Sequence, residues 1–200
     1  MAQKVMKMAK KIGKKKPVEV VHPPFLKTII KAGQATAAPP LGSQLSQRGI
    51  NVAQFCKDFN TKTAHMIEGT PIPTRVFVKP DRTCDIVLHS PPSAWLIMRA
   101  AGIRRGSMYG MKTVVGKISR KHIYEIAKLK QTDDTKQVMS LESLCRLQCV
   151  IAFKMGVEVV DGDLDPVEYR QFLEQRQEEM RLEMKELEEA KAAKMLRTTV

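Results

Sequence analysis

The chain has 200 residues, of which 43% are hydrophobic, and this fraction is enough for packed cores and excludes a wholly disordered protein. It contains no run of 18 apolar residues, so we expect no transmembrane helix and no membrane partner. The formal net charge of +13 is uneven: residues 165–200 hold nine acidic and seven basic side chains and net −2, so residues 1–164 net +15. Such a charge attracts a polyanion, which favours a nucleic-acid partner over a basic surface that serves only solubility.

A lysine-rich segment opens the chain. Residues 1–16 contain seven lysines and no acid, and Val5, Met8 and Ile12 recur among them at helical spacing. Such a segment is typical of a basic arm that lies on RNA. A matrix-targeting segment has a similar character, although such segments usually favour arginine. The sequence leaves both interpretations open.

Residues 17–89 are predicted to form a small α/β domain with a short antiparallel sheet. Apolar residues at 52, 55, 56 and 59 follow helical spacing after Asn51, whose side chain is a good N-cap. Two strand-like runs flank a Pro-Asp-Arg turn at 80–82, which predicts a hairpin. The expected elements are a strand at 25–31, a helix at 52–63 and strands at 72–79 and 83–89.

An Ala/Pro/Gly-rich stretch at 32–49 interrupts this domain. Pro39 and Pro40 exclude a long helix there, although one short helical turn can start at them. The run from Pro39 to Gly42 is either a stiff turn between strand and helix or an apolar, preorganised docking face. The residues alone do not choose between these two interpretations.

Ser90, Pro91 and Pro92 mark the best domain boundary. Two adjacent prolines form a stiff, extended connector that cannot join a β-ladder. We therefore expect a hinge at 90–92, with a second domain after it.

Residues 93–160 are predicted to form a compact three-helix domain that ends in a short strand. Ser93 is expected to cap the first helix and Ser119 the second. The third helix is apolar on nearly all sides, which predicts that it is buried. The expected bounds are 93–101 for the first helix, 140–155 for the third and 157–160 for the strand.

The loop at 103–117 is the most distinctive local feature of the chain. It carries three glycines, four basic residues and no acid. Glycines let a backbone approach phosphates closely, and the bases supply charge. After the loop, Ser119, Arg120 and Lys121 stand at a helix N-terminus, where free N–H groups and the helix dipole favour a phosphate. The alternative is a mobile basic loop without a ligand. The basic residues of the loop are Arg104, Arg105, Lys112 and Lys117.

The end of the chain predicts a long charged helix at 165–196. Asp165, Pro166 and Glu168 form a strong helix start, with an N-cap, a proline at the first position and an acid at the third. A thin apolar stripe follows among dense charges. The pattern fits a lone solvated helix or a helix docked weakly on a partner.

No residue pattern indicates catalysis. The four histidines are isolated in different predicted elements, and the four cysteines form no Cys-x-x-Cys pair. No nucleophile elbow, phosphate-binding P-loop or His-Glu-x-x-His motif occurs. We therefore expect a non-enzymatic protein with no cofactor and no metal, and we disfavour an RNA-modifying enzyme. The competing hypothesis is a basic helix-turn-helix DNA-binding protein, but the largely apolar third helix lacks polar base-reading side chains.

Five ungapped segments follow one another in the order AGQATAAPPLGSQLSQRGINVAQFCKDFNTKT, PIPTRVFVKPDRT, SPPSAWLIMRAAGIRRGS, VGKISRKHIYEIAKLK and KMGVEVV. Together they resemble the L-eleven family of ribosomal large-subunit proteins over about residues 25–160. The resemblance implies a structural constituent of the ribosome whose 93–160 domain binds folded large-subunit rRNA at the GTPase-associated centre. It implies that the 17–89 domain meets translation elongation factors beside neighbouring stalk proteins, with Pro39, Pro40 and Gly42 facing a cleft.

The same resemblance assigns RNA contact to individual positions. The VKPDRT stretch, the KHIYEIAK helix and the charged tail look more like the mitochondrial branch, which implies a ribosome of the mitochondrial matrix. The alternative location is the bacterial cytoplasm. The counterparts of the family's RNA-contacting loop and helix start are Gly106, Ser107, Lys112, Gly116, Lys117, Ser119, Arg120 and Lys121.

The chain departs from the family late in the third helix. The family usually has a Gly-Thr-Ala-basic-Ser run there that packs small residues against RNA, whereas this chain has Val-Ile-Ala-Phe-Lys at 150–154. Bulkier side chains prevent an equally close backbone approach, so we expect a changed or looser RNA contact, with Lys154 supplying the charge one position later. Tyr109 in the loop either stacks on a base or is an ordinary surface residue.

Overall fold

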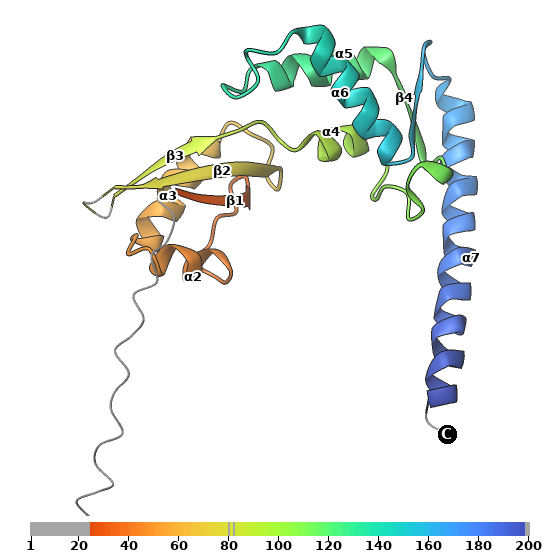
Figure 1. Cartoon of the computed structure of the whole chain (residues 1–200), viewed down its shortest axis with the longest axis horizontal. Coiled ribbons are helices and arrows are strands. Elements are labelled where there is room, and N and C mark those ends of the chain that lie inside the picture. The colour runs from red at the N-terminus through yellow and green to blue at the C-terminus, as the bar shows by residue number, and fades with distance from the viewer. Residues whose placement is uncertain (1–24, 80, 82, 199–200) are drawn as a thin grey trace, which may run out of the picture.

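The computed structural model describes residues 25–79, 81 and 83–198. The lysine-rich segment 1–16 lies outside the described residues. Figure 1 shows an α/β unit and a helical unit joined by an extended linker, with a long C-terminal helix beside the helical unit. This arrangement confirms the expected α+β class, with a small antiparallel sheet and a long final helix. None of the described helices is long and apolar enough to cross a membrane.

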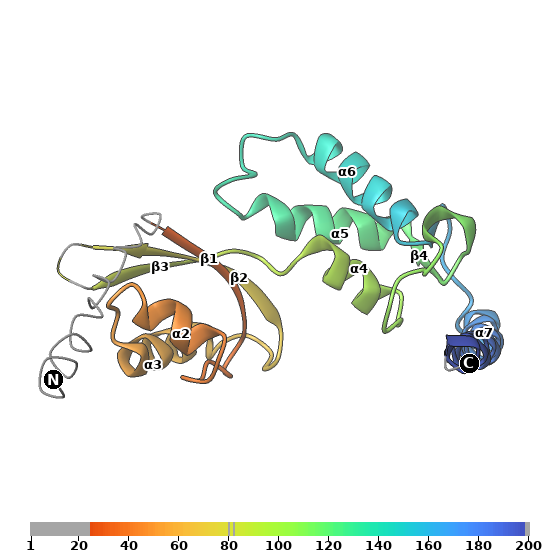
Figure 2. The same ribbon diagram turned by 60° about the horizontal axis from the view of Figure 1, so that its bottom comes forward.

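The α/β unit is a three-stranded antiparallel sheet in the order β1-β2-β3, with two helices on one face (Figures 1 and 2). Asn51 caps the longer helix as predicted, because its Oδ1 accepts the N–H groups of Ala53 and Gln54 at 3.1 and 3.3 Å. The elements are β1 (Phe25–Lys31), α2 (Leu41–Ser46), α3 (Val52–Thr63), β2 (Pro71–Val78) and β3 (Cys84–Leu88).

The core of this unit lies between the sheet and the two helices. Because successive side chains of a strand point to opposite faces, the even-numbered residues of β1 and β2 face the helices and the odd-numbered ones face away. The buried side chains of the core include Leu26, Ile30, Leu45, Phe55, Phe59, Ile72 and Val76.

The helical unit contains three α-helices and a two-stranded parallel sheet. Side chains from all three helices and both strands form its core, which includes Ile97, Ile118, Ile123, Ala152 and Val157. The elements are α4 (Ser93–Ala100), η1 (Gly110–Lys112), β4 (Gly116–Ser119), α5 (Arg120–Gln131), α6 (Leu141–Lys154) and β5 (Val157–Val160).

Two local predictions for this unit are wrong. The last residues of the expected 103–117 loop form β4, because Gly116 through Ser119 pair with β5, whose residues lie some forty positions later. Ser93 does not cap α4: Pro92 occupies the N-cap position with extended backbone, and no side chain caps the helix. Ser93 is instead the first helical residue.

The expectation that the third helix is buried on nearly all sides is also wrong. Val150 is 49% exposed and Phe153 is 60% exposed, whereas the buried residues of α6 are Leu144, Gln148 and Ala152. These three stand four apart, so they form a single stripe. The reason is geometric: a domain of three short helices covers only one side of each helix.

The final helix α7 (Pro166–Thr198) docks on the helical unit with its first turns. The Tyr169 hydroxyl donates to the Ala101 carbonyl at 2.5 Å and accepts the Lys117 N–H at 3.2 Å. The Lys117 ammonium lies 5.3 Å from the centre of the Phe172 ring. The rest of α7 continues away from the helical unit (Figure 1). The start of the helix is therefore an integral part of this domain.

Candidate nucleic-acid interface

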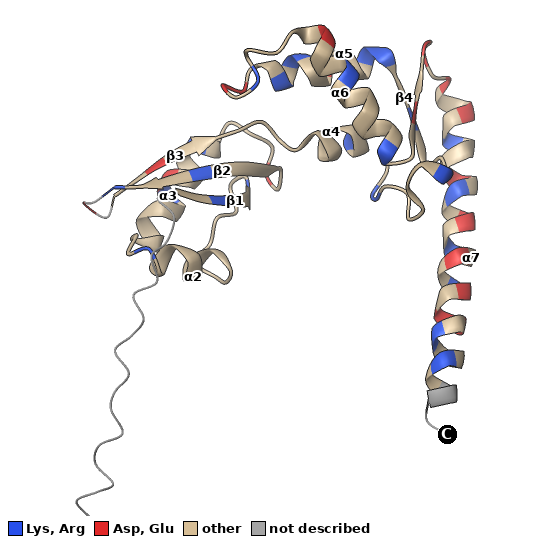
Figure 3. Cartoon of the chain, in the orientation of Figure 1, with Lys and Arg blue, Asp and Glu red and all other residues tan. Residues whose placement is uncertain are grey.

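Exposed basic residues gather on the loop between α4 and β4 and at the end of α6 (Figure 3). Arg104, Arg105 and Lys112 of the loop and Lys154 of α6 are all exposed. Within the described part of the chain, no acidic side chain forms an ion pair with any of these four. Their charge is therefore available to an external anion.

Backbone contacts hold this loop against the C-terminal end of α6. The Ser107 N–H donates to the Met155 carbonyl at 2.8 Å, and the Val115 N–H donates to the Gly156 carbonyl at 2.7 Å. The hydroxyls of Ser107 and Thr113 are hydrogen-bonded to each other across the loop. The loop is therefore fixed at both ends, which places its basic residues on the same side of the domain as the end of α6.

Gly156 makes this close approach possible, and sequence reasoning did not select it as a site residue. Its φ is +77°, and a Cβ there would lie 2.4 Å from the Thr113 carbonyl oxygen and 2.6 Å from the Ser107 Cβ. Gly106 faces the same end of α6, because a Cβ on it would lie 3.1 Å from the Met155 carbonyl oxygen. The only sequence signal for this role is a glycine placed directly after the third helix.

Exposed apolar side chains lie among these bases. Tyr109 is 52% exposed, and Met108 and Met111 beside it are also exposed. Phe153 and Val150 are the exposed apolar residues of α6. A surface that combines planar or flexible apolar groups with free cations suits nucleic acid, whose bases stack while its phosphates pair with the cations.

The second half of the expected RNA-binding segment has a different environment. Lys117 pairs with Glu158 at 3.3 Å, Arg120 with Asp161 at 2.5 Å and Lys121 with Asp163 at 2.8 Å. The sequence analysis did not select these three acids, which lie on β5 and just after it. All three pairs are at least one-third exposed, so screening keeps each pair weak. Even so, the acids reduce the positive field at the start of α5.

Two further residues of this half have structural roles. Ser119 is buried and caps α5 as predicted: its hydroxyl accepts the Lys121 N–H, while its own N–H donates to His122 Nδ1 at 3.3 Å. Gly116 is buried beneath α7, and a Cβ there would lie 3.1 Å from the Ile103 Cγ2 and 3.4 Å from the Tyr169 hydroxyl. RNA contact by Gly116 and Ser119 stays a prediction, and the structure supplies a packing reason for each.

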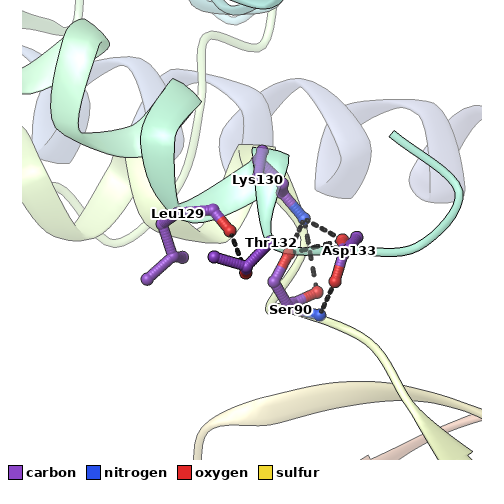
Figure 4. A network of polar contacts seen from close by, with 5 residues as sticks. All are labelled: Ser90, Leu129, Lys130, Thr132 and Asp133. Atoms are coloured by element: carbon purple, nitrogen blue, oxygen red, sulfur yellow. Dashed lines mark hydrogen bonds and ion pairs between the residues drawn. The ribbon is translucent and has the colours of Figure 1, made fainter. Parts of the chain in front are cut away.

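The linker is fastened to the end of α5 by a buried polar cluster (Figure 4). The backbone N–H and hydroxyl of Ser90 both donate to the Asp133 carboxylate, each at 2.6 Å. The Lys130 ammonium donates to the Ser90 hydroxyl at 2.9 Å and to its carbonyl at 3.2 Å. Burial lowers the pKa of Lys130, and Asp133 partly opposes that shift. Ser90 is thus tied to the helical unit, while a hinge at Ser90, Pro91 and Pro92 stays a prediction.

The proline turn is exposed and rests on a close backbone contact. Pro39 and Pro40 are exposed, and the Pro40 carbonyl accepts the Ser43 hydroxyl at 2.9 Å. Gly42 is buried, and a Cβ on it would lie 2.1 Å from the Ala37 carbonyl oxygen. Only glycine fits there, so Gly42, two residues after the second proline, packs closely against the Ala37 backbone.

Comparison with known families agrees with this division of the chain. The model of the ribosomal protein L11 N-terminal domain matches residues 26–84, and that of the ribosomal protein L11 RNA binding domain matches residues 89–159. The chain belongs to the ribosomal protein L11 family. The second match covers the loop, α5 and α6, so the helical unit is the RNA-binding domain of the family.

Curated relatives give the same result. The large ribosomal subunit protein uL11m of Caenorhabditis elegans is 50% identical over 193 residues, covering 96% of this chain and 98% of that protein. The uL11m of Drosophila melanogaster is 46% identical over 196 residues, covering 96% of this chain and all of that protein. The uL11 of Rickettsia bellii is 41% identical over 133 residues, which cover 66% of this chain and 90% of that protein.

Membership of the L11 family establishes the general role of the chain. It is a structural ribosomal protein of the large subunit that binds rRNA, and the family is not one of enzymes. The uL11m relatives agree with the expected mitochondrial location. Among the described residues, no group of three or more His, Cys, Asp or Glu side chains lies close enough to hold a metal ion.

Proposed function

We propose that this L11-family protein acts at the GTPase-associated centre of the large subunit. The 93–160 domain stabilises a compact fold of rRNA there, and the 17–89 domain meets translation elongation factors beside neighbouring stalk proteins. The observation that carries the proposal is the loop from Arg104 to Lys112, whose cations have no acidic partner in the described structure and whose backbone is fixed on α6. A fixed, unneutralised basic loop recognises the shape of a folded RNA without reading its sequence.

The RNA half of the proposal is tested by binding. The full chain should bind a folded fragment of its own large-subunit rRNA, and the affinity should fall steeply as salt rises, because each neutralised phosphate releases counterions. Duplex DNA of equal length is the competitor. Preference for duplex DNA would support the helix-turn-helix alternative and contradict the proposal.

The factor half of the proposal rests on the exposed turn at Pro39 and Pro40. A rigid apolar turn is a suitable docking face because little conformational entropy is lost when a partner binds it. Large subunits depleted of this protein and rebuilt with a Pro39→Ala/Pro40→Ala chain should retain the protein on the rRNA. They should stimulate the GTPase activity of an elongation factor less than subunits rebuilt with the natural chain. Equal stimulation would contradict a factor contact at this turn.

A further inference from the structure

Besides the interface on the helical unit, the α/β unit has a surface with the features of an RNA-contacting site. It is the face of the sheet that points away from α2 and α3, called here the open sheet face (Figure 2). Its residues form three cross-strand pairs between β1 and β2: Phe25 with Phe77, Lys27 with Arg75, and Ile29 with Pro73. The face therefore places one aromatic pair directly beside one cationic pair.

The side chains of these pairs remain accessible. Phe77 is 40% exposed and Ile29 is 63% exposed, although an apolar residue on a half-buried sheet usually points into a core. The rings of Phe25 and Phe77 lie 6.1 Å apart between centres and are tilted by 42°. Two neighbouring rings held by strand pairing present a rigid aromatic surface that loses little entropy when a planar group stacks on it.

The charges on this face attract an anion. The Lys27 ammonium lies 5.3 Å from the centre of the Phe25 ring, and no acid pairs with Lys27 or Arg75 in the described chain. One acid also lies on this face: Asp85 of β3 stands opposite Phe77, and its carboxylate pairs with Lys79 at 2.8 Å. The open sheet face thus keeps at least two cations without a fixed counter-charge.

The same side chains line a depression that widens toward the helical unit. A shallow hollow of about 200 Å³ is lined by Phe25, Lys27, Arg75 and Phe77. A groove of about 660 Å³ continues from Lys27 and Arg75 to His89 and to the Ser90–Lys130–Asp133 cluster. The open sheet face therefore borders a groove that leads to the RNA-binding domain.

We propose that the open sheet face binds unpaired RNA nucleotides. Bases stack on Phe25 and Phe77, and the adjoining phosphates pair with Lys27 and Arg75. An acidic peptide without aromatic residues would satisfy the cations but would offer no aromatic group to the two rings, whereas a nucleotide satisfies both. The proposal rests on the rRNA-binding role of the chain and adds to it a second contact, outside the RNA-binding domain of the family.

The direct test is nuclear magnetic resonance of the full chain, titrated with a short unstructured RNA such as a mixed-sequence hexanucleotide. The ring signals of Phe25 and Phe77 should shift. A glutamate hexapeptide at the same concentration should shift them much less. The proposal is overturned if the ring signals stay in place while those of the 104–112 loop move, or if the peptide shifts the rings as strongly as the RNA does.

A second measurement uses matched variants of the full chain. Phe25→Leu/Phe77→Leu keeps apolar side chains on the strands but removes both rings, and it should weaken binding of the hexanucleotide roughly tenfold, as expected for lost base stacking. Ile29→Leu, on the same face but without a ring, should bind like the natural chain. An equal loss in both variants, or no loss in either, contradicts stacking.

The failure of this proposal can be told apart from failure of the proposed function. Loss of rings on the open sheet face should leave binding of the folded rRNA fragment within about twofold, because that fragment is held by the helical unit. Removing the loop cations should weaken binding of the folded rRNA fragment, and the hexanucleotide should still shift the ring signals of Phe25 and Phe77. Each surface therefore has its own readout.

Discussion

The first and second halves of the 103–121 segment look alike in sequence but differ in the folded protein. The first half, from Arg104 to Lys112, presents cations that no acid of the described residues pairs with, on a loop fixed to α6. In the second half, Lys117, Arg120 and Lys121 each pair with an acid, and Gly116 is buried under α7. A basic, glycine-containing segment therefore contains both the surface proposed to bind RNA and a docking surface for other parts of the chain itself.

This difference shows how charge and glycine acquire their roles. A cation acts on an external phosphate when no internal acid is close, and a glycine permits close approach of whatever backbone or ring lies opposite. For Gly156 the neighbour is the loop itself, and for Gly116 the neighbours are Ile103, Ala101 and the hydroxyl of Tyr169, which lies fifty-three positions later. We expect changes in the first half to affect RNA affinity and changes in the second half to affect stability.

Removing the free cations should have the largest effect. The triple variant Arg104→Gln/Arg105→Gln/Lys112→Gln should weaken binding of the folded rRNA fragment on the order of a hundredfold at physiological salt and make the salt dependence shallower. The matched control, Arg120→Gln/Lys121→Gln, removes exposed but paired cations and should weaken binding only a few-fold. Titration at several salt concentrations measures both. Equal losses of affinity in the two variants would contradict the proposed difference between the two halves of the 103–121 segment.

Filling the space at Gly116 should have the next largest effect. The new Cβ of Gly116→Ala would meet Ile103 and Ala101 at 3.1 and 3.3 Å, so we expect the free energy of unfolding to fall by about 1–3 kcal/mol through overpacking. Gly162→Ala is the control, because a Cβ there has no neighbour within 4 Å. Thermal unfolding of the two variants provides the comparison. A stable Gly116→Ala chain with impaired RNA binding would instead assign this glycine to the RNA surface.

Tyr169→Phe should reduce stability by a smaller amount. It keeps the ring but removes the hydrogen bonds to Ala101 and Lys117. The free energy of unfolding should therefore fall by about 1–2 kcal/mol. Tyr124→Phe, at an exposed tyrosine, should leave the free energy of unfolding unchanged. Denaturant titration of both variants measures the difference. If the two variants lose the same amount, Tyr169 does not fasten α7.

The same tyrosine predicts a dependence on pH. Burial raises the pKa of Tyr169 above its ordinary value of 10.0, and the Lys117 N–H and charge only partly oppose this. The folded chain therefore keeps the phenol protonated at a pH where the unfolded chain has lost the proton. This contribution to stability is complete below pH 10 and is lost as pH rises through the folded pKa, a loss that Tyr169→Phe should not show.

Removing the acids of the second half should have the smallest effect and the opposite sign. Asp161→Asn/Asp163→Asn leaves Arg120 and Lys121 able to pair with phosphate. We expect affinity for the folded rRNA fragment to rise only about two- to threefold, because the exposed ion pairs that are removed are weak. Asp81→Asn, an exposed acid on the α/β unit, is the control. Unchanged affinity would mean that the start of α5 lies away from the RNA.

Much of the fold follows from local patterns. The sequence pattern predicted most strands and helices, β4 excepted, to within a few residues, and Asn51 and Ser119 are N-caps because their side chains satisfy N–H groups only two or three positions away. The net charge indicated a nucleic-acid partner, and the resemblance of the ordered segments to a family implied rRNA binding in the large subunit. The helices, their caps and the net charge depend on neighbours in the chain or on composition, so they can be read without knowing the tertiary structure.

Only the tertiary structure decided how the 103–121 segment is divided. β4 exists because β5 lies beside it, Lys117 is paired because Glu158 stands opposite it, and Gly116 is covered because Tyr169 of α7 packs there. The side of α6 that is exposed was likewise set by which faces of α4 and α5 meet it. Each of these partners lies tens of residues away, and local sequence does not encode which distant groups a fold will bring together.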